Sequence, residues 1–191
     1  ETRRTEYFLR AARELHKPVR FVDWQQAGGM EFHEDVVKLD PPSYKSSDLY
    51  EMNDHLASFH RQMKQLEMTG GIYLNPPSEI LRLLDKRHCK EILMEKEVPV
   101  TEMLEEKVEN AEQLMETMKR HRSFSVFIKP VYSSGAAGVT AFRLAPGQGR
   151  MMAYTSCVLQ RGELVNTKKL RRLENTQEIC RLLEAVLSLG A

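Results

Sequence analysis

The first 77 residues alternate between helical and strand-like patterns of apolar positions. Apolar residues three and four apart predict amphipathic helices, and short apolar runs bounded by proline or glycine predict strands. A helix followed by a short strand is typical of a βαβ unit, whose first strand we expect to lie before Glu1. The predicted elements are helices over 5–16 and 53–68, strands over 19–24, 35–39 and 72–74, and a loop over 43–52.

The remainder of the chain predicts a second set of helices and strands. Asn75-Pro76-Pro77 breaks the preceding strand, so we place a domain boundary there. Ser78, Asp85 and Asn175 are residue types that cap helix N-termini, and Arg161-Gly162 predicts a hairpin turn. The predicted elements are helices over 78–84, 86–96, 111–121 and 176–189, and strands over 98–103, 124–129, 139–144, 151–160, 163–165 and 168–173.

Together these elements predict an α/β protein with a partial, Rossmann-like domain over residues 1–77, first strand missing, and an α+β domain over 78–191. Of the 191 residues, 41% are apolar and 29% are charged, as in ordinary globular proteins. A net charge of +1 provides no overall electrostatic field that would attract nucleic acid or a membrane surface. No apolar run is long enough to span a membrane. Three widely spaced cysteines without a CxxC pair argue against disulfides and zinc, and favour the cytoplasm.

The segment 124–139 combines a strand, a lysine and a loop of small residues. Alternation places Ser125, Phe127 and Lys129 on one face of the strand, where a lysine in a packed layer needs an anion to meet it. The residues of the 133–138 loop are all small, so successive backbone N–H groups can approach a phosphate. No GK[ST] or GxGxxG accompanies the loop, which excludes a Walker A loop and a Rossmann fingerprint. On this local pattern alone, a plain hairpin with a solvated lysine stays open as an alternative.

This segment resembles the ATP-grasp family, in which an apolar strand ends in Lys-Pro and leads through a serine- and glycine-rich loop to a valine-led strand. The corresponding residues are Lys129-Pro130 and Gly138-Val139. Family members also carry Asp-Lys at the start of an earlier helix that leads to Val-Pro, which matches Asp85-Lys86 and Val98-Pro99. The two lysines lie 43 positions apart, a spacing that fits the family. Ala136-Ala137 stands where the family often has glycines, and it stiffens the loop.

The resemblance, which is to bacterial members without an assigned substrate, implies an ATP-binding function. The second domain would be the nucleotide-binding subdomain of an ATP-grasp ligase, and the first a pre-ATP-grasp domain. Such an enzyme joins a carboxylate to an amine or thiol through an acylphosphate, with ATP and Mg²⁺ as cofactors. The resemblance assigns no catalytic residue. The cofactor-binding residues that it implies are Lys86, Lys129, Ser133, Ser134, Gly135 and Gly138.

Magnesium ligands in this family are acidic and asparagine residues of a further subdomain. Glu174, Glu178 and Glu184 do not reproduce that pattern. We therefore expect the Mg²⁺ ligands outside this sequence, and we expect the chain alone to be inactive as a ligase. The alternative is a nucleotide-binding or interaction module without catalysis.

Two other groups of residues are weaker candidates. The run Lys168–Arg172 could contact an anionic substrate or nucleic acid, but we favour a solvated strand edge that discourages sheet pairing. His55 and His60 lie five positions apart, which is not the i, i+4 spacing of a helical metal pair, and the adjacent His88 and Cys89 point to different faces. We therefore predict no metal site.

Overall fold

The computed structural model describes residues 2–41, 46–104, 107–133, 135–147 and 149–190. The chain divides into two compact units, which are considered separately. Unit 1 comprises 1–45 and 57–83, and unit 2 comprises 46–56 and 84–191. This division differs from the predicted boundary, because helix α4 (Pro77–Leu84) stays with unit 1 up to Leu83 and the first turns of helix α3 (Leu49–Leu66) belong to unit 2.

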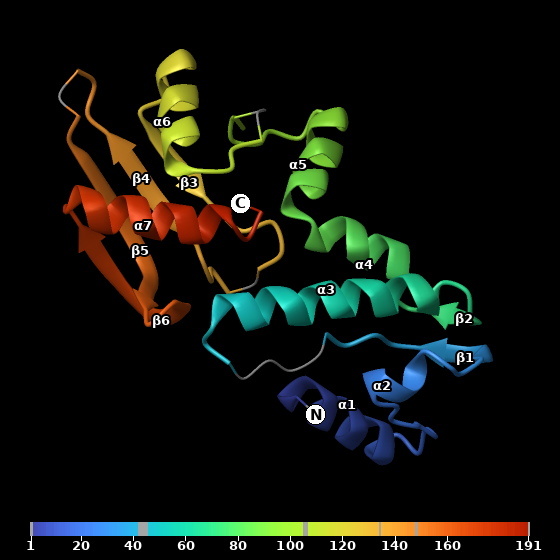
Figure 1. Cartoon of the computed structure of the whole chain (residues 1–191). Helices are drawn as coiled ribbons and strands as arrows, with labels where there is room; N and C mark the ends of the chain where they lie inside the picture. Colours follow the sequence, from blue (N-terminus) through green and yellow to red (C-terminus); the bar gives the residue numbers. More distant parts are fainter. Residues whose placement is uncertain (1, 42–45, 105–106, 134, 148, 191) are drawn as a thin grey trace. The chain divides into compact units, whose positions relative to one another are not determined.

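Unit 1 contains helices around a short parallel sheet (Figure 1). Strands β1 and β2 lie near the predicted strands over 35–39 and 72–74, and they pair in parallel. Its core includes Phe59, Met63 and Leu66 of α3, whose side chains are at most 2% exposed. In addition to α3 and α4, the elements are α1 (Arg3–Glu14), α2 (Trp24–Ala27), β1 (His33–Val37) and β2 (Gly70–Tyr73).

Two predictions in this part of the chain are wrong. Residues 19–23 form no strand and Trp24 begins α2, because Trp24 is held by other contacts. Its indole N–H donates to the Asp40 carbonyl at 3.0 Å, and its ring lies edge-on to Phe59 with centroids 4.9 Å apart. The predicted loop is also wrong from Leu49 onward, where α3 begins. The Asp48 carboxylate accepts the backbone N–H of the second helical residue at 2.9 Å, which is a helix-start contact.

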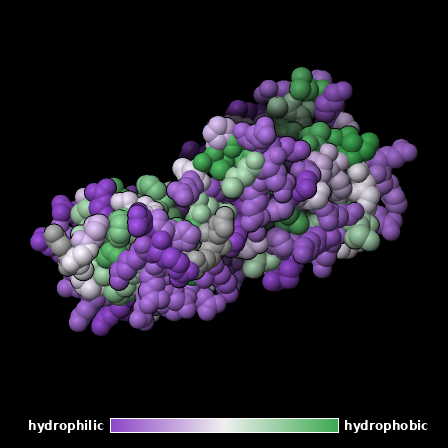
Figure 2. Space-filling model, turned by 90° about the horizontal axis from the view of Figure 1, so that it is seen from above, coloured by the Kyte–Doolittle hydropathy of each residue, from purple (hydrophilic) through white to green (hydrophobic). Residues whose placement is uncertain are grey.

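Several apolar side chains of unit 1 remain exposed. Helix α1 buries Thr5 and Ala12, but Tyr7 in the helix and Leu15 at its C-cap are more than half exposed, although both belong to the predicted apolar stripe. Exposed apolar residues appear as separate green areas on a mostly hydrophilic face in Figure 2. The helix is nevertheless well started, because Thr2 and Thr5 form a reciprocal capping box.

Unit 2 is built on a four-stranded antiparallel sheet in the order β3-β4-β5-β6. The predicted turn between β5 and β6 is confirmed, and Arg161 and Gly162 both have positive φ, as a type I′ hairpin requires. Two strands were predicted after this turn, but β6 is continuous and carries an irregularity where Lys168 adopts φ 58°. The elements are α5 (Lys86–Glu95), α6 (Ala111–Arg120), β3 (Ser125–Ile128), β4 (Thr140–Leu144), β5 (Met151–Gln160), β6 (Glu163–Leu173) and α7 (Thr176–Leu187).

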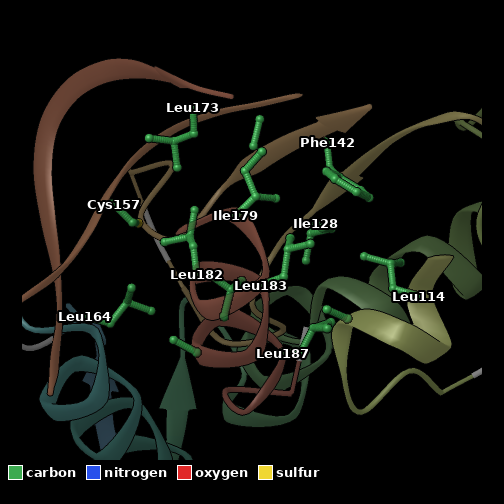
Figure 3. Packing of buried hydrophobic residues seen from close by; sticks show 14 of the residues in the cluster. Leu114, Ile128, Phe142, Cys157, Leu164, Leu173, Ile179, Leu182, Leu183 and Leu187 are labelled. Carbon is green, nitrogen blue, oxygen red and sulfur yellow. The ribbon is translucent and has the colours of Figure 1, made fainter. Parts of the chain in front are cut away.

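One face of this sheet forms the core of unit 2 with helix α7. Buried and less buried residues alternate along β4 and the middle of β5, as expected for strands with one covered face. Ile179, Leu182 and Leu183 of α7 point toward Phe142 and its neighbours on the sheet (Figure 3). Helix α6 packs beside α7. The predicted strand over 98–103 is wrong: that segment joins no sheet.

A pair of buried threonine hydroxyls links β4 to β5 inside this core. Thr140 Oγ1 donates to Thr155 Oγ1 at 3.1 Å, and Thr155 Oγ1 donates to the Val139 carbonyl at 3.2 Å. The Cys157 N–H also donates to Thr155 Oγ1, at 3.1 Å. The Thr155 hydroxyl is therefore the centre of a small polar network.

Replacing Thr155 with valine keeps the shape of the side chain but leaves the Thr140 hydroxyl and the Cys157 N–H without their partner. We expect the free energy of unfolding to fall by about 1–3 kcal/mol, the cost of unsatisfied buried polar groups. Thr155→Ser, which retains the hydroxyl, is the control and should lose less. Urea unfolding of both variants measures the difference, and a valine variant as stable as the wild type would contradict the network's role.

Candidate functional site

The start of helix α5 is fixed by Asp85. As predicted, Asp85 is the N-cap: its Oδ1 accepts the backbone N–H groups of Arg87 and His88, both at 2.9 Å. Its other oxygen accepts the Tyr132 hydroxyl at 3.3 Å. Burial and the Asp85 charge raise the pKa of Tyr132, so this hydroxyl keeps its proton. Asp85 therefore connects the start of α5 to the loop that follows β3.

Lys86 makes the second connection to the same loop. Its Nζ donates to the carbonyl oxygens of Pro130 at 3.0 Å, Val131 at 2.9 Å and Ser133 at 2.7 Å, and it contacts Ser133 Oγ at 3.0 Å. An ammonium group has three protons, so these contacts occupy all of its donors. In this structure Lys86 holds the loop in place.

Lys129 follows the last residue of β3 and is exposed to solvent. Its ammonium lies 5.9 Å from the centre of the Phe127 ring, which places both side chains on the face predicted by alternation. Burial, followed by the charge of Lys129, lowers the pKa of Lys86, while Asp85 partly opposes this shift. Burial and the charge of Lys129 lower the pKa of Lys90 as well. Lys129 thus lies close enough to both lysines of α5 to repel them.

Lys90 is a member of this group that the sequence analysis missed. It lies four residues after Lys86 on α5, so both project from the same side of the helix. This i, i+4 spacing was the available signal. Its Nζ donates to Thr101 Oγ1 at 3.1 Å and to the Glu102 carbonyl at 3.3 Å, which holds the segment predicted as a strand against α5.

None of the three lysines forms an ion pair with a carboxylate of the described residues. Lysine ion pairs in that part of the chain are Lys38–Asp40 and Lys107–Glu109. Lys86, Lys90 and Lys129 are therefore a concentration of positive charge that Asp85 only partly balances. Such a group favours an anion of several charges. We call these three residues the lysine cluster.

The small-residue loop is divided between solvent and core. Gly135 has φ 60°, and a Cβ there would meet open space. Ala137 is 1% exposed and belongs to the core of unit 2. Gly138 is also buried, and a Cβ there would lie 2.5 Å from Pro130 Cγ. Among the described residues of the loop, Gly135 and Ala136 are the exposed ones that a ligand could approach.

The structure therefore brings together some of the predicted residues and separates others. Lys86 and Ser133 are hydrogen-bonded, and Lys129 lies near them. Gly135 is exposed nearby, whereas Gly138 is a packing residue of the turn. Ser134, the remaining predicted residue, lies outside the described residues.

The uncovered face of the sheet continues from Lys129. Phe127 is 71% exposed on this face. The strand registers place it beside Ala141, then Tyr154, then Arg172, in one row across all four strands. The row carries two aromatic side chains, and one of them, Phe127, lies beside Lys129 of the lysine cluster.

The basic run on β6 is partly neutralised. Arg171 forms an ion pair with Glu178 at 3.3 Å, and Arg172 pairs with Glu174. These contacts favour a solvated strand edge over an anion site.

Within the described ranges, no group of three histidine, cysteine or acidic residues could hold a metal ion. The helices of the same ranges include none with the length and apolar character needed to cross a membrane. Comparisons of the chain with protein-family models, with curated proteins and with solved structures find no match.

Proposed function

We propose that unit 2 binds ATP, with the triphosphate at the lysine cluster. The observation that carries this proposal is that Lys129, after the end of β3, lies near both lysines of α5, without a matching set of carboxylates among the described residues. A triphosphate would supply the missing negative charge. It would also favour the protonated forms of Lys86 and Lys90, whose pKa values burial and Lys129 lower.

The residues of the cluster would have different tasks. Lys129 has no hydrogen-bond or ion-pair partner among the described residues, and so it is the group available to a phosphate. Before nucleotide binds, Lys86 would act as a positioning residue, because its donors hold the carbonyl groups of the loop. The exposed backbone around Gly135 would close toward the phosphates, as loops over phosphates do.

The purine base would lie on the uncovered face of the sheet. Phe127 and Tyr154 are the aromatic residues of the row beside Lys129. Stacking of a base on an aromatic side chain contributes about 1–3 kcal/mol. Phe127 lies beside Lys129, with the ammonium 5.9 Å from the ring centre, so a base on this row and phosphates at Lys129 could belong to one nucleotide.

The order of these parts supports an ATP-grasp-like mode of binding. A helix beginning Asp85-Lys86 precedes an antiparallel hairpin, and that hairpin carries Lys129 and the small-residue loop. We accordingly propose ATP-dependent ligation of a carboxylate to an amine or thiol as the activity of the protein. The described residues do not fit a resident Mg²⁺, so no step is assigned to that ion.

Binding of Mg-ATP by isothermal titration calorimetry tests the proposal. Lys129→Met should weaken binding by about 10- to 100-fold, because a charge-assisted contact is worth about 1.5–3 kcal/mol. Lys119→Met, at an exposed lysine in the last turn of α6, is the matched control and should bind as the wild type does. Absence of Mg-ATP binding by the wild type, or equal affinity of both variants for Mg-ATP, would contradict the proposal. Turnover of Mg-ATP by the intact protein separates the ligase from a non-catalytic module.

The lowered pKa values of Lys86 and Lys90 predict a pH dependence of ATP affinity. Below the lowered pKa values both lysines are charged, and affinity should be highest there. As pH rises through those values, still below the ordinary 10.5, the charges are lost and affinity should fall.

The stability of the fold should change with pH in the opposite direction to ATP affinity, because of the same lowered pKa values. Unfolded lysines retain protons that the folded ones have released, so over this pH range the free energy of unfolding should rise with pH from this source. Calorimetric titrations at a series of pH values measure the effect on binding. An affinity that stays constant up to the ordinary lysine pKa would contradict the prediction.

A further inference from the structure

Four oxygen atoms surround the ammonium of Lys86. We call them the carbonyl cage: the carbonyl oxygens of Pro130, Val131 and Ser133, and the Ser133 hydroxyl. Their distances from Nζ lie between 2.7 and 3.0 Å. None of the four atoms carries a formal charge, and three belong to the main chain. Their positions therefore depend on the shape of the loop rather than on flexible side chains.

The dimensions of the cage select the kind of cation that fits it. Potassium and ammonium ions are of nearly equal size, and in proteins rings of carbonyl oxygens replace the hydration shell of K⁺. Mg²⁺ requires oxygens at about 2.0–2.1 Å and Ca²⁺ at about 2.3–2.6 Å, both shorter than the distances in this cage. Neutral oxygens also compensate poorly for the lost hydration of a divalent ion.

We infer that the carbonyl cage is a binding site for a monovalent cation of ammonium size, K⁺ or NH₄⁺, which Lys86 fills with its own ammonium in this structure. When that ammonium is removed, or turns toward an anion, a free ion of the same size takes its place and the loop keeps its shape. The replacement of the Lys86 ammonium by a free ion during nucleotide binding rests on the proposed function. The affinity of the empty cage for the ion does not depend on it.

The surroundings of Lys86 favour such an exchange. Lys129 repels its ammonium, and a triphosphate held at Lys129 would attract it. If Lys86 moved to the phosphate without replacement, three carbonyl groups of the loop would lose their donor. An ion from solution would supply the same charge at the same place.

The first experiment uses Lys86→Met, which removes the ammonium and retains most of the side-chain length. Thermal unfolding followed by circular dichroism is compared in KCl, NH₄Cl, NaCl and tetramethylammonium chloride, each at on the order of 0.1 M so that screening is equal. We expect the variant to melt below the wild type in NaCl and tetramethylammonium chloride. In KCl and NH₄Cl its melting temperature should rise by about 3 °C or more.

In the wild type and in Lys90→Met, Lys86 still fills the cage. The melting temperature of each of these two proteins should therefore be the same in the four salts. Equal melting of Lys86→Met in all of them would overturn the inference. A variant that stays unfolded in KCl as it does in tetramethylammonium chloride would also overturn it, because a cage that accepts the ion must restore the fold. Adding Ser133→Ala, which deletes one cage oxygen, should reduce the rise in KCl.

The second experiment tests the exchange in the wild type. Mg-ATP affinity is measured in KCl and in NaCl at equal ionic strength, and should be roughly three- to tenfold higher in KCl. Salt-selective melting of Lys86→Met without this difference would retain the ion site and reject the exchange. Absence of ATP binding in either salt would reject the proposed function and leave the cage to be judged by the first experiment.

Discussion

Replacing Phe142 with alanine is expected to lower the free energy of unfolding of unit 2 by about 3–5 kcal/mol, the range for large aromatic residues removed from a core. Phe142 is 1% exposed, and it faces helix α7 from the middle of β4 (Figure 3). The cavity left by the ring would be lined by Ile179 and its neighbours, which belong to a packed cluster and can collapse only partly.

The matched control is Phe127→Ala on the neighbouring strand. Phe127 and Phe142 lie one register position apart in the β3–β4 hairpin, but they point to opposite faces of the sheet. Because Phe127 is 71% exposed, its loss should change stability by less than about 1 kcal/mol while weakening ATP binding by roughly 5- to 100-fold. Chemical denaturation and calorimetric titration of both variants separate the two effects. Similar losses of stability would show that the uncovered face is also a packed face.

Gly138→Ala should destabilise unit 2 by about 2–4 kcal/mol, combining the cost of a non-glycine residue at positive φ with that of overpacking. Gly138 has φ 79°, and an added Cβ would lie 2.5 Å from Pro130 Cγ and 2.8 Å from Pro130 Cδ. The proline ring is itself buried and cannot move without displacing the loop that Lys86 holds. The substitution should therefore disturb the lysine cluster as well as the fold.

Gly135→Ala is the control for the steric part of that effect. Gly135 also has positive φ, but a Cβ there would meet nothing within 4 Å, and Ala136 beside it already adopts φ 60°. Its cost should be about 1–2 kcal/mol, that of the backbone conformation alone. Urea unfolding followed by circular dichroism compares the two variants. If the free energy of unfolding falls equally in both variants, the contact with Pro130 contributes nothing to the cost of Gly138→Ala.

The sequence predicted best the elements whose signals are local. Asp85 and Asn175 cap α5 and α7 as expected, and the turn at Arg161-Gly162 produces the predicted hairpin. Each signal depends on residues within a few positions of one another. Local chemistry therefore determined these boundaries.

Predictions failed where a distant partner decides the structure. Residues 19–24 have the composition of a strand, but a strand requires a neighbour, and Trp24 is instead held by Asp40 and Phe59. The segment 98–103 is likewise bound to Lys90, and it joins no sheet. Residue type and spacing contain no information about these contacts.

The candidate site was predicted only in part for a similar reason. A lysine at a strand end and another at a helix start could be recognised from the motif. The binding of Lys86 by main-chain carbonyl groups could not be recognised in this way, because every residue type has the same main-chain carbonyl. Only the path of the loop brings three of these carbonyl groups together around Lys86. Gly138 likewise belongs to the motif, but its contact with Pro130 depends on the fold of the turn.

The position of Trp24 has a consequence for how the two units can be observed. It is the single tryptophan of the chain, and it lies in unit 1 with its ring against Phe59. Tryptophan emission therefore reports the melting of unit 1. It should not change when a change is confined to unit 2, where the lysine cluster lies. A tryptophan signal from the site itself requires a second tryptophan, such as that introduced by Phe127→Trp.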